Sequence, residues 1–96
     1  MYKIEVNEKA ILDLNWIYDY LYEITFSLDF SRDFVQDVYK KILYLKLFPS
    51  MYQNTYKNFK TIQIKSYKIF YKVNETKKIV TIFRILWASQ NFREYI

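Results

Sequence analysis

The stretch YKIFYKVNETKKIVTIFRILW, residues 67–87, decides the fold. In residues 67–73, bulky apolar side chains alternate with lysines, which is typical of a strand with one wet face. The polar run 74–77 predicts a turn. Residues 78–87 are β-branched or apolar at both odd and even positions, as in a strand covered on both faces. The stretch therefore predicts a β-hairpin.

Shorter patterns before and after this hairpin complete the predicted chain. FKTIQIK, residues 59–65, alternates in the same way and predicts a third antiparallel strand. YKIEV, residues 2–6, alternates like a short strand with one wet face. Residues 49–58 show no period and predict a connecting loop, while SQNFREYI, residues 89–96, predicts one helical turn or a loose end.

Between residues 7 and 48, apolar side chains recur every three to four positions, which predicts two amphipathic helices. Asn7 is suited to cap the first helix, expected over about residues 8–24, and Ser27 to cap the second. The second apolar stripe ends at Phe48, because Pro49 disfavours helical geometry in the residue before it.

The predicted fold class is α+β. An N-terminal strand is followed by a helical hairpin and three antiparallel strands, in the order β-α-α-β-β-β, with the helices packed on one face of a small sheet. Residues 1–96 are expected to form one domain.

The 96-residue chain contains no cysteine and no histidine. Disulfides and thiolate metal sites are therefore excluded, and so is the side chain that most often transfers protons near neutral pH. No cofactor and no metal is expected. No apolar run approaches the ~18 residues of a membrane-spanning helix, so we expect a cytoplasmic protein without a membrane partner.

Charge is divided unevenly along the sequence. Residues 1–38 carry three cations against eight anions, a formal charge of −5. Residues 39–96 carry twelve cations against two anions, a formal charge of +10. A basic half of this strength predicts a polyanionic partner or an acidic protein surface.

The basic half supplies the candidate binding residues. Six cations are candidates for contact with phosphate or with an acidic partner: Lys60, Lys65, Lys68, Lys72, Arg84 and Arg93. Tyr67, Tyr71 and Trp87 are candidates for partner contact, since aromatic strand residues can stack on a base. The alternatives are a solvated outward face for the lysines and cross-strand packing for the tyrosines.

Some residues have two interpretations or a purely structural one. Arg84 lies in the most apolar strand, so it either faces a groove, which we expect, or is paired with an anion inside the protein. Trp16 and Trp87 are expected in the core or in a partner contact. Three carboxylates are expected on a wet helix face without a catalytic role: Asp13, Asp19 and Glu23.

Three motifs in this order resemble the RelE/ParE superfamily of bacterial toxins: DLNWIYDY at 13–20, YKIFY at 67–71 and IFRIL at 82–86. The resemblance spans nearly the whole chain. It implies a toxin of a type II toxin–antitoxin system that arrests growth, as in plasmid stabilisation. It also implies a cognate antitoxin that wraps the toxin with an amphipathic segment and neutralises it. A homodimer and a toxin–antitoxin hetero-oligomer are both compatible with it.

The resemblance leaves two targets open. RelE-like members cut mRNA in the ribosomal A site, whereas ParE-like members inhibit DNA gyrase. Lys68 stands where RelE-like nucleases have a phosphate-contacting arginine. A nuclease of this kind, without histidine or metal, would use Lys68, Arg84 and Tyr95 as its catalytic residues, with Arg93 as the tail arginine.

The segment LWASQN, residues 86–91, argues against the nuclease. Many relatives carry His-Gly-x-Arg here, whereas this chain has Trp87, Ala88 and Gln90. The long helical hairpin is also more ParE-like. Inhibition of DNA gyrase or a similar target is therefore favoured, mRNA cleavage is the alternative, and a degenerate homologue that only binds its antitoxin is the third. Whether the protein is an enzyme depends on this choice.

Overall fold

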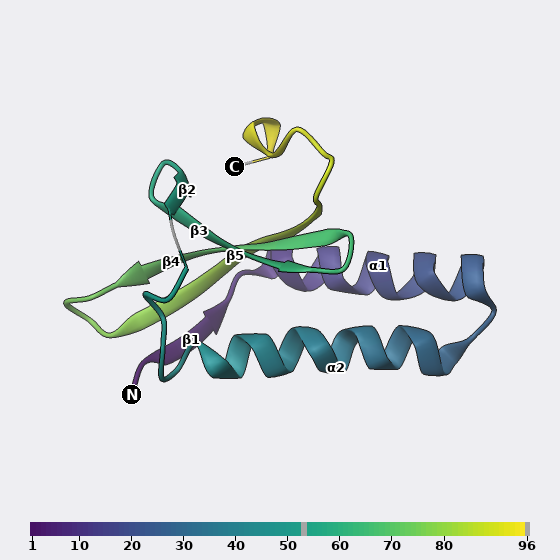
Figure 1. Cartoon of the computed structure of the whole chain (residues 1–96), viewed down its shortest axis with the longest axis horizontal. Coiled ribbons are helices and arrows are strands. Elements are labelled where there is room, and N and C mark those ends of the chain that lie inside the picture. Colours follow the sequence, from purple (N-terminus) through teal and green to yellow (C-terminus); the bar gives the residue numbers. More distant parts are fainter. Residues whose placement is uncertain (53, 96) are drawn as a thin grey trace.

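The computed structural model describes residues 1–52 and 54–95, with the backbone alone at residue 56. It confirms an α+β fold, in which a helical hairpin packs on one face of a five-stranded sheet (Figure 1). In chain order the elements are β1 (Lys3–Val6), α1 (Glu8–Thr25), α2 (Leu28–Tyr44), β2 (Asn54–Tyr56), β3 (Phe59–Ile64), β4 (Tyr67–Asn74), β5 (Ile79–Trp87) and the short 3-10 helix η1 (Phe92–Glu94).

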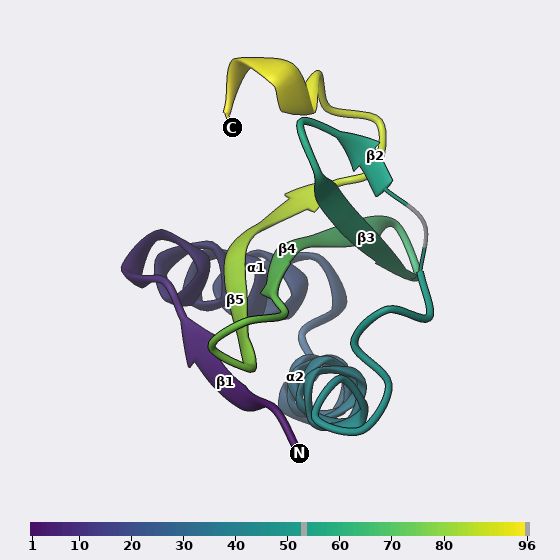
Figure 2. The same ribbon diagram turned by 90° about the vertical axis from the view of Figure 1, so that its left-hand side faces the viewer.

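The strand order across the sheet is β1-β5-β4-β3-β2 (Figure 2). β5 lies between its antiparallel hairpin partner β4 and the N-terminal strand β1. β1 runs parallel to β5 and pairs only with its first half, from Lys3 opposite Ile79 to Val6 opposite Ile82. The second half of β5 therefore has a neighbouring strand on one side only.

One strand and one helix end differ from the prediction. The predicted loop 49–58 contains β2, an edge strand that pairs with β3 and that, with three residues, is too short to show a period. The second helix ends at Tyr44 rather than at Phe48. The N–H groups of residues 45–47 bond to carbonyls three residues back, so the chain tightens and leaves the helix before Pro49. Residues 53 and 96, in the predicted loop and tail, lie outside the described residues.

The helix starts are capped as predicted. Asn7 Oδ1 accepts a hydrogen bond from the N–H of Lys9 (3.3 Å), and Ser27 Oγ accepts one from the N–H of Phe30 (3.1 Å). Between the helices, Phe26 adopts a left-handed conformation with φ 53°. The chain has no glycine for such positions, and four other described residues also have positive φ: Lys57, Asn58, Lys65 and Lys78. Residues with full side chains therefore make the tight turns.

The main core lies between the helices and the sheet. α1 contributes Ile17, α2 contributes Phe34 and Val38, and the sheet contributes Tyr71 and Ile82, all of them almost fully buried. On the helices these residues belong to the apolar stripes of the sequence, so the predicted amphipathic faces are the buried ones.

A smaller apolar cluster lies on the opposite face of the sheet. Phe59, Phe70 and Leu86 are buried there, and Phe92 of η1 packs on Phe70 with the ring centroids 5.2 Å apart. Figure 2 shows the C-terminal tail on the side of the sheet away from the helices. Because helices cover one face of β5 and this cluster covers the other, the apolar character of β5 at both parities is explained.

Tyr71 provides a test of the core. Its side chain is fully buried, and its hydroxyl donates a hydrogen bond to the carbonyl oxygen of Pro49 (3.0 Å). We expect Tyr71→Phe to lower the free energy of unfolding by about 1–2 kcal/mol, because the carbonyl of buried Pro49 loses its partner. Chemical denaturation of the two proteins measures the difference, and equal stability would contradict this role.

The same residue makes stability sensitive to alkali. Burial raises the pKa of the Tyr71 hydroxyl above its ordinary value of 10.0. The unfolded chain therefore loses this proton at a lower pH than the folded protein, so the contribution of Tyr71 is complete below about pH 10 and falls above it. Tyr71→Phe should flatten the decline of stability above pH 10, and an unchanged decline would assign it to other groups.

Candidate functional site

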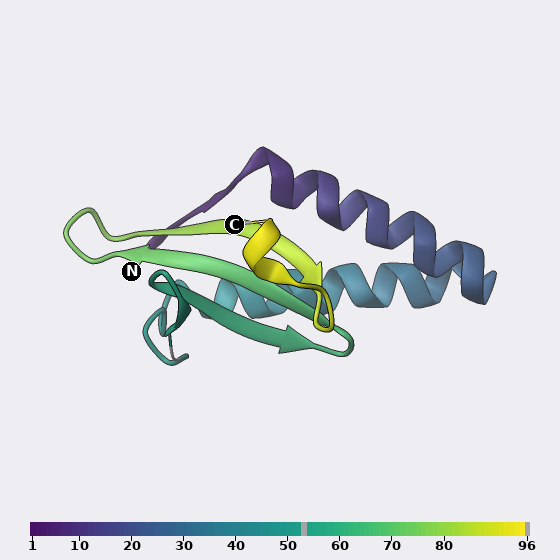
Figure 3. The same ribbon diagram turned by 90° about the horizontal axis from the view of Figure 1, so that it is seen from above.

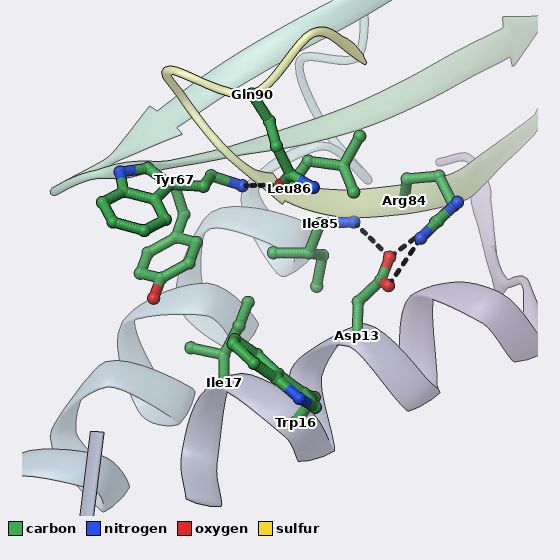
Figure 4. A pocket seen from close by; sticks show the side chains of 9 residues that line it. Asp13, Trp16, Ile17, Tyr67, Arg84, Ile85, Leu86 and Gln90 are labelled. Atoms are coloured by element: carbon green, nitrogen blue, oxygen red, sulfur yellow. Dashed lines mark hydrogen bonds and ion pairs between the residues drawn. The ribbon is translucent and has the colours of Figure 1, made fainter. Parts of the chain in front are cut away.

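The edge of β5 that β1 leaves uncovered is closed by a carboxylate of α1 (Figure 4). Asp13 Oδ2 accepts hydrogen bonds from Nε of Arg84 (2.7 Å) and from the backbone N–H of Ile85 (2.9 Å). Asp13 Oδ1 accepts one from Nη2 of Arg84 (2.8 Å). The side chains of Asp13 and Arg84 are only 14% and 17% exposed, so water competes little for these bonds. We call this arrangement the Asp13–Arg84 clamp.

A β-bulge in β5 precedes the clamp. Phe70 of β4 pairs with Arg84, whereas the next residue, Tyr71, pairs with Ile82, so Phe83 is the extra residue of the bulge. A bulge bends its strand and re-aims the side chains beside it. In this structure the side chain of Arg84 extends from β5, which is otherwise apolar at this point, to Asp13 of α1.

The clamp corrects one prediction and decides another. Asp13 was expected on a wet helix face, but it is mostly buried and bonded to the sheet. Of the two interpretations of Arg84, the internal ion pair is observed, although Arg84 also lines a pocket on each side. The hydrogen bonds that Arg84 donates to Asp13, offset in part by burial, raise the pKa of the Arg84 guanidinium above its already high ordinary value.

An apolar groove runs between α1 and the end of β5 and has a volume of about 390 Å³. Its wall consists mainly of Trp16, Ile17, Tyr67, Leu86 and Trp87, with the clamp at one end. Figure 4 shows Trp16 and Ile17 on α1 opposite Tyr67 and Ile85 of the sheet. Trp16 is 62% exposed and Trp87 49%, so of the two expected places, the core and a partner contact, the core is excluded and both side chains are available for contact.

A second cavity, the basic pocket, lies beside the other face of the clamp and has a volume of about 380 Å³. It is lined by Asn7, Lys9, Lys57, Phe59, Lys72, Phe83, Arg84 and Tyr95. The ammonium of Lys72 lies 4.4 Å from the ring centroid of Phe59, and the guanidinium carbon of Arg84 lies 5.5 Å from that of Tyr95. Of the predicted site residues, Lys72, Arg84 and Tyr95 are therefore brought together here.

The other predicted cations are distributed over different parts of the surface. Lys68 shares the open face of β4 with Phe70, but it lines neither pocket of Arg84. Lys60 pairs opposite Tyr71 on the helix side and donates to the carbonyl of Tyr52 (2.7 Å). Lys65 lies in the β3–β4 turn, over the ring of Phe30, and Arg93 lies in η1. These cations therefore do not form the single face that the alternating lysines predicted.

The strand tyrosines point toward the helices. Tyr71 is fully buried in the core, which excludes the predicted partner contact in this structure. Tyr67 is mostly buried beside Phe34, with ring centroids 5.3 Å apart, and its remaining surface lines the apolar groove. Burial raises the pKa of Tyr67 above its ordinary value.

The tip of the helical hairpin is an exposed apolar surface that the sequence patterns did not single out. Phe26 in the turn is 84% exposed, and Tyr22, Leu28 and Phe30 around it are also exposed. Figure 3 shows that the hairpin extends past the ends of the strands at this tip. In the sequence, the sign of this surface is the pair of apolar residues that flank the predicted cap at Ser27. We call these four residues the hairpin tip.

Neither helix of the described residues is long and apolar enough to cross a membrane. Within residues 1–52 and 54–95, no group of three or more acidic, cysteine or histidine side chains is placed to hold a metal ion.

Comparisons with known proteins agree with this architecture. The family described as "ParE toxin of type II toxin-antitoxin system, parDE" matches residues 4–92. A comparison with curated proteins gives no match. A chain of the chromosomal ParDE toxin–antitoxin system of P. aeruginosa superposes with a TM-score of 0.79 at 20% identity, over 93% of this chain and 98% of that one.

RelE structures from E. coli are also similar. A chain of the intact RelBE complex gives a TM-score of 0.64 at 16% identity, over 94% of this chain and 100% of that one. A mutant of RelE in the free state, with two arginines replaced by alanine, gives 0.69 at 15% identity, over 98% of this chain and 90% of that one. At these identities the superpositions establish the fold alone.

The family match covers nearly the whole chain. The protein belongs to the ParE family of toxins of type II toxin–antitoxin systems, within the RelE/ParE superfamily that the sequence motifs resemble.

The clamp can be tested with a double-mutant cycle. We expect Asp13→Ala and Arg84→Ala each to lower the free energy of unfolding by about 2–4 kcal/mol, because each leaves the other charge partly buried without its partner. The double variant should lose little more than either single variant. Asp19→Ala, at an exposed position of the same helix, is the control and should unfold like the wild type. Additive losses in chemical denaturation would show that the two side chains act independently.

Proposed function

We propose that the protein arrests growth in the cytoplasm by binding a large protein target, with DNA gyrase the favoured one, and that a cognate antitoxin neutralises it. The exposed apolar hairpin tip carries this proposal. It lies at the far end of the helices, away from both pockets of Arg84, and its four side chains are exposed, although Lys65 lies over the ring of Phe30. Exposed aromatic residues on a projecting element are typical of protein interfaces.

The state of Arg84 supports a non-nucleolytic action. Two of the three guanidinium nitrogens, Nε and Nη2, already donate to Asp13, and Nη1 donates to the carbonyl of Tyr95 at 3.3 Å. A phosphate would have to compete with this carboxylate for the bidentate face of Arg84. Lys68, which stands at the position of the nuclease arginine, lies outside both pockets of Arg84.

The apolar groove suits an antitoxin. Trp16 and Trp87 are exposed on its two sides, and the clamp at its end covers the N–H of Ile85 on the edge of β5. An amphipathic segment seated there would bury both indoles, and large aromatic anchors contribute most to such interfaces.

Messenger RNA cleavage is the second candidate. The contact between Arg84 and Tyr95 favours it, because a cation and a tail tyrosine meet on the open face of the sheet. Cutting RNA also needs a proton acceptor near the 2′-hydroxyl, and the chain offers no histidine for it.

The target is tested by expression without antitoxin. We expect DNA replication to stop first and the purified protein to inhibit supercoiling by gyrase. Early loss of translation with mRNA cut inside codons would instead establish the nuclease. Normal growth at good expression would contradict both and leave only antitoxin binding.

The hairpin tip is tested by Phe26→Asn. Asparagine tolerates the left-handed conformation at this position, so the turn should be retained while the exposed ring is lost. We expect the concentration for half-inhibition of gyrase to rise about tenfold, as for an interface anchor. Met51→Asn removes another exposed apolar side chain, beyond the other end of α2, and should leave inhibition unchanged. Equal effects of the two variants would contradict a role of the tip.

The antitoxin groove is tested by Trp16→Ser. We expect binding of the cognate antitoxin, measured by calorimetry, to weaken about tenfold, because the exposed indole would be an anchor. Tyr39→Ser changes an exposed aromatic on α2 outside the groove and serves as the control. Unaltered antitoxin binding by the Trp16 variant would place the interface elsewhere.

A further inference from the structure

The basic pocket is built from cations of separate elements. Lys9 comes from the first turn of α1, Lys57 from the β2–β3 turn and Lys72 from β4, with the clamped Arg84 between them. None of the described residues that line the pocket is a carboxylate. The charge of Arg84 is balanced by Asp13, whereas neither Lys9 nor Lys72 forms an ion pair within the described residues. The cavity therefore has a positive potential.

Two phenyl rings hold one of these cations in place. Phe59 and Phe83 meet edge to face, with ring centroids 5.2 Å apart. The ammonium of Lys72 lies 4.4 Å from the centroid of Phe59 and 5.7 Å from that of Phe83. Such contacts stabilise a cation without neutralising it. Lys72 is thus positioned at the pocket with its full charge available to an anion.

The helix start adds to the same potential. α1 begins at the pocket, where Asn7 lines the cavity and caps the helix. The amino end of an 18-residue helix carries a partial positive charge, and Glu8 in its first turn is exposed and is not part of the lining. Several positive groups around one cavity repel one another, and a multiply charged anion would relieve this repulsion.

One wall of the pocket is flat and aromatic. Tyr95 is 41% exposed, and its ring lies against the guanidinium of Arg84, which also donates to the carbonyl of Tyr95. Aromatic rings next to cations are platforms on which nucleobases stack. The volume of about 380 Å³ is within the range of small-ligand sites.

We propose that the basic pocket binds a nucleoside polyphosphate, with the phosphates among Lys9, Lys57 and Lys72 and the base against Tyr95. The lysines surround a pocket and do not form a linear row along the surface, which favours a small ligand over a nucleic-acid strand. Lys60 and Lys65, which would extend such a row along β3, lie on the helix side and in the β3–β4 turn. This site is separate from the hairpin tip, so it does not depend on inhibition of gyrase. The Arg84–Tyr95 contact that lines it is also the one that favours mRNA cleavage, and the oligothymidylate probe below distinguishes a small ligand from a nucleic-acid strand.

Titration calorimetry on the full chain tests the proposal with four probes: ADP, tripolyphosphate, adenosine and a short single-stranded oligothymidylate. We expect ADP and tripolyphosphate to bind at one site, adenosine to show no binding, and ADP affinity to fall as salt is raised. Tyr95→Ala should weaken ADP about tenfold and leave tripolyphosphate unchanged, since only ADP has a base to stack.

Charge variants locate the phosphates. Lys72→Gln and Lys9→Gln should each weaken ADP about tenfold, the loss expected for one charge-assisted contact. Lys77→Gln makes the same change of charge in the exposed β4–β5 turn and should bind like the wild type. Thermal unfolding would show whether Lys72→Gln impairs folding. Lys9 is exposed, so Lys9→Gln should fold normally, and its ADP affinity then tests the proposal without Lys72→Gln.

Three results would overturn the proposal. They are the absence of ADP binding, ADP binding that is unchanged in the Lys9 and Lys72 variants, and binding of the oligothymidylate without binding of ADP. The last result would make the pocket part of a nucleic-acid surface. All three are distinct from a failure to inhibit gyrase, because the calorimetric measurements contain no gyrase.

Discussion

The bond between Asp13 and Arg84 organises the part of the molecule where function is expected. β1 stops halfway along β5, and α1 begins immediately afterwards, so a helix lies where a strand would otherwise continue the sheet. Asp13 satisfies the N–H of Ile85 that this arrangement leaves without a strand partner. It also holds Arg84, whose side chain divides the apolar groove from the basic pocket. One carboxylate thus closes a sheet edge and separates two surfaces of different chemistry.

The two faces of the sheet are stabilised by different means and have different uses. On the helix side, a continuous core with Phe34 and Tyr71 fixes the hairpin, whose tip then extends into solvent. On the other side, Phe70 and Phe92 hold the short tail over the sheet, and the tail brings Tyr95 to Arg84. Protein contact is proposed for the helix side and phosphate contact for the tail side, so the same small sheet can present two partners with separate surfaces.

Local patterns predicted most of the fold. The caps at Asn7 and Ser27 depend on neighbouring residues, and the hairpin of β4 and β5 on strand alternation and a short polar turn, so both were visible in the sequence. The role of Asp13 was not, because its partner Arg84 is 71 residues away and the helical wheel alone places Asp13 with the solvated carboxylates. Contacts between distant residues carry no periodic signal.

The candidate site was predictable in its residue types but not in its grouping. Alternation assigned the lysines of the strands to one wet face, yet Lys60 is on the helix side and Lys65 is in a turn. A bulge at Phe83 also changes the parity of β5 next to Arg84. Such one-residue shifts exchange the two faces of a strand, which explains why Lys72, Arg84 and Tyr95 meet while the other cations do not.

The absence of glycine from the turns has a consequence for how the protein can change. Lys57, Lys65 and Lys78 hold left-handed backbone conformations that cost roughly 1 kcal/mol each in a residue with a Cβ atom. Glycine would remove that cost at every one of these corners, but it would also delete an ammonium group from the rim of the molecule. A glycine at these positions would therefore remove that cost together with a surface charge, whereas the lysines keep the charge and the strained backbone.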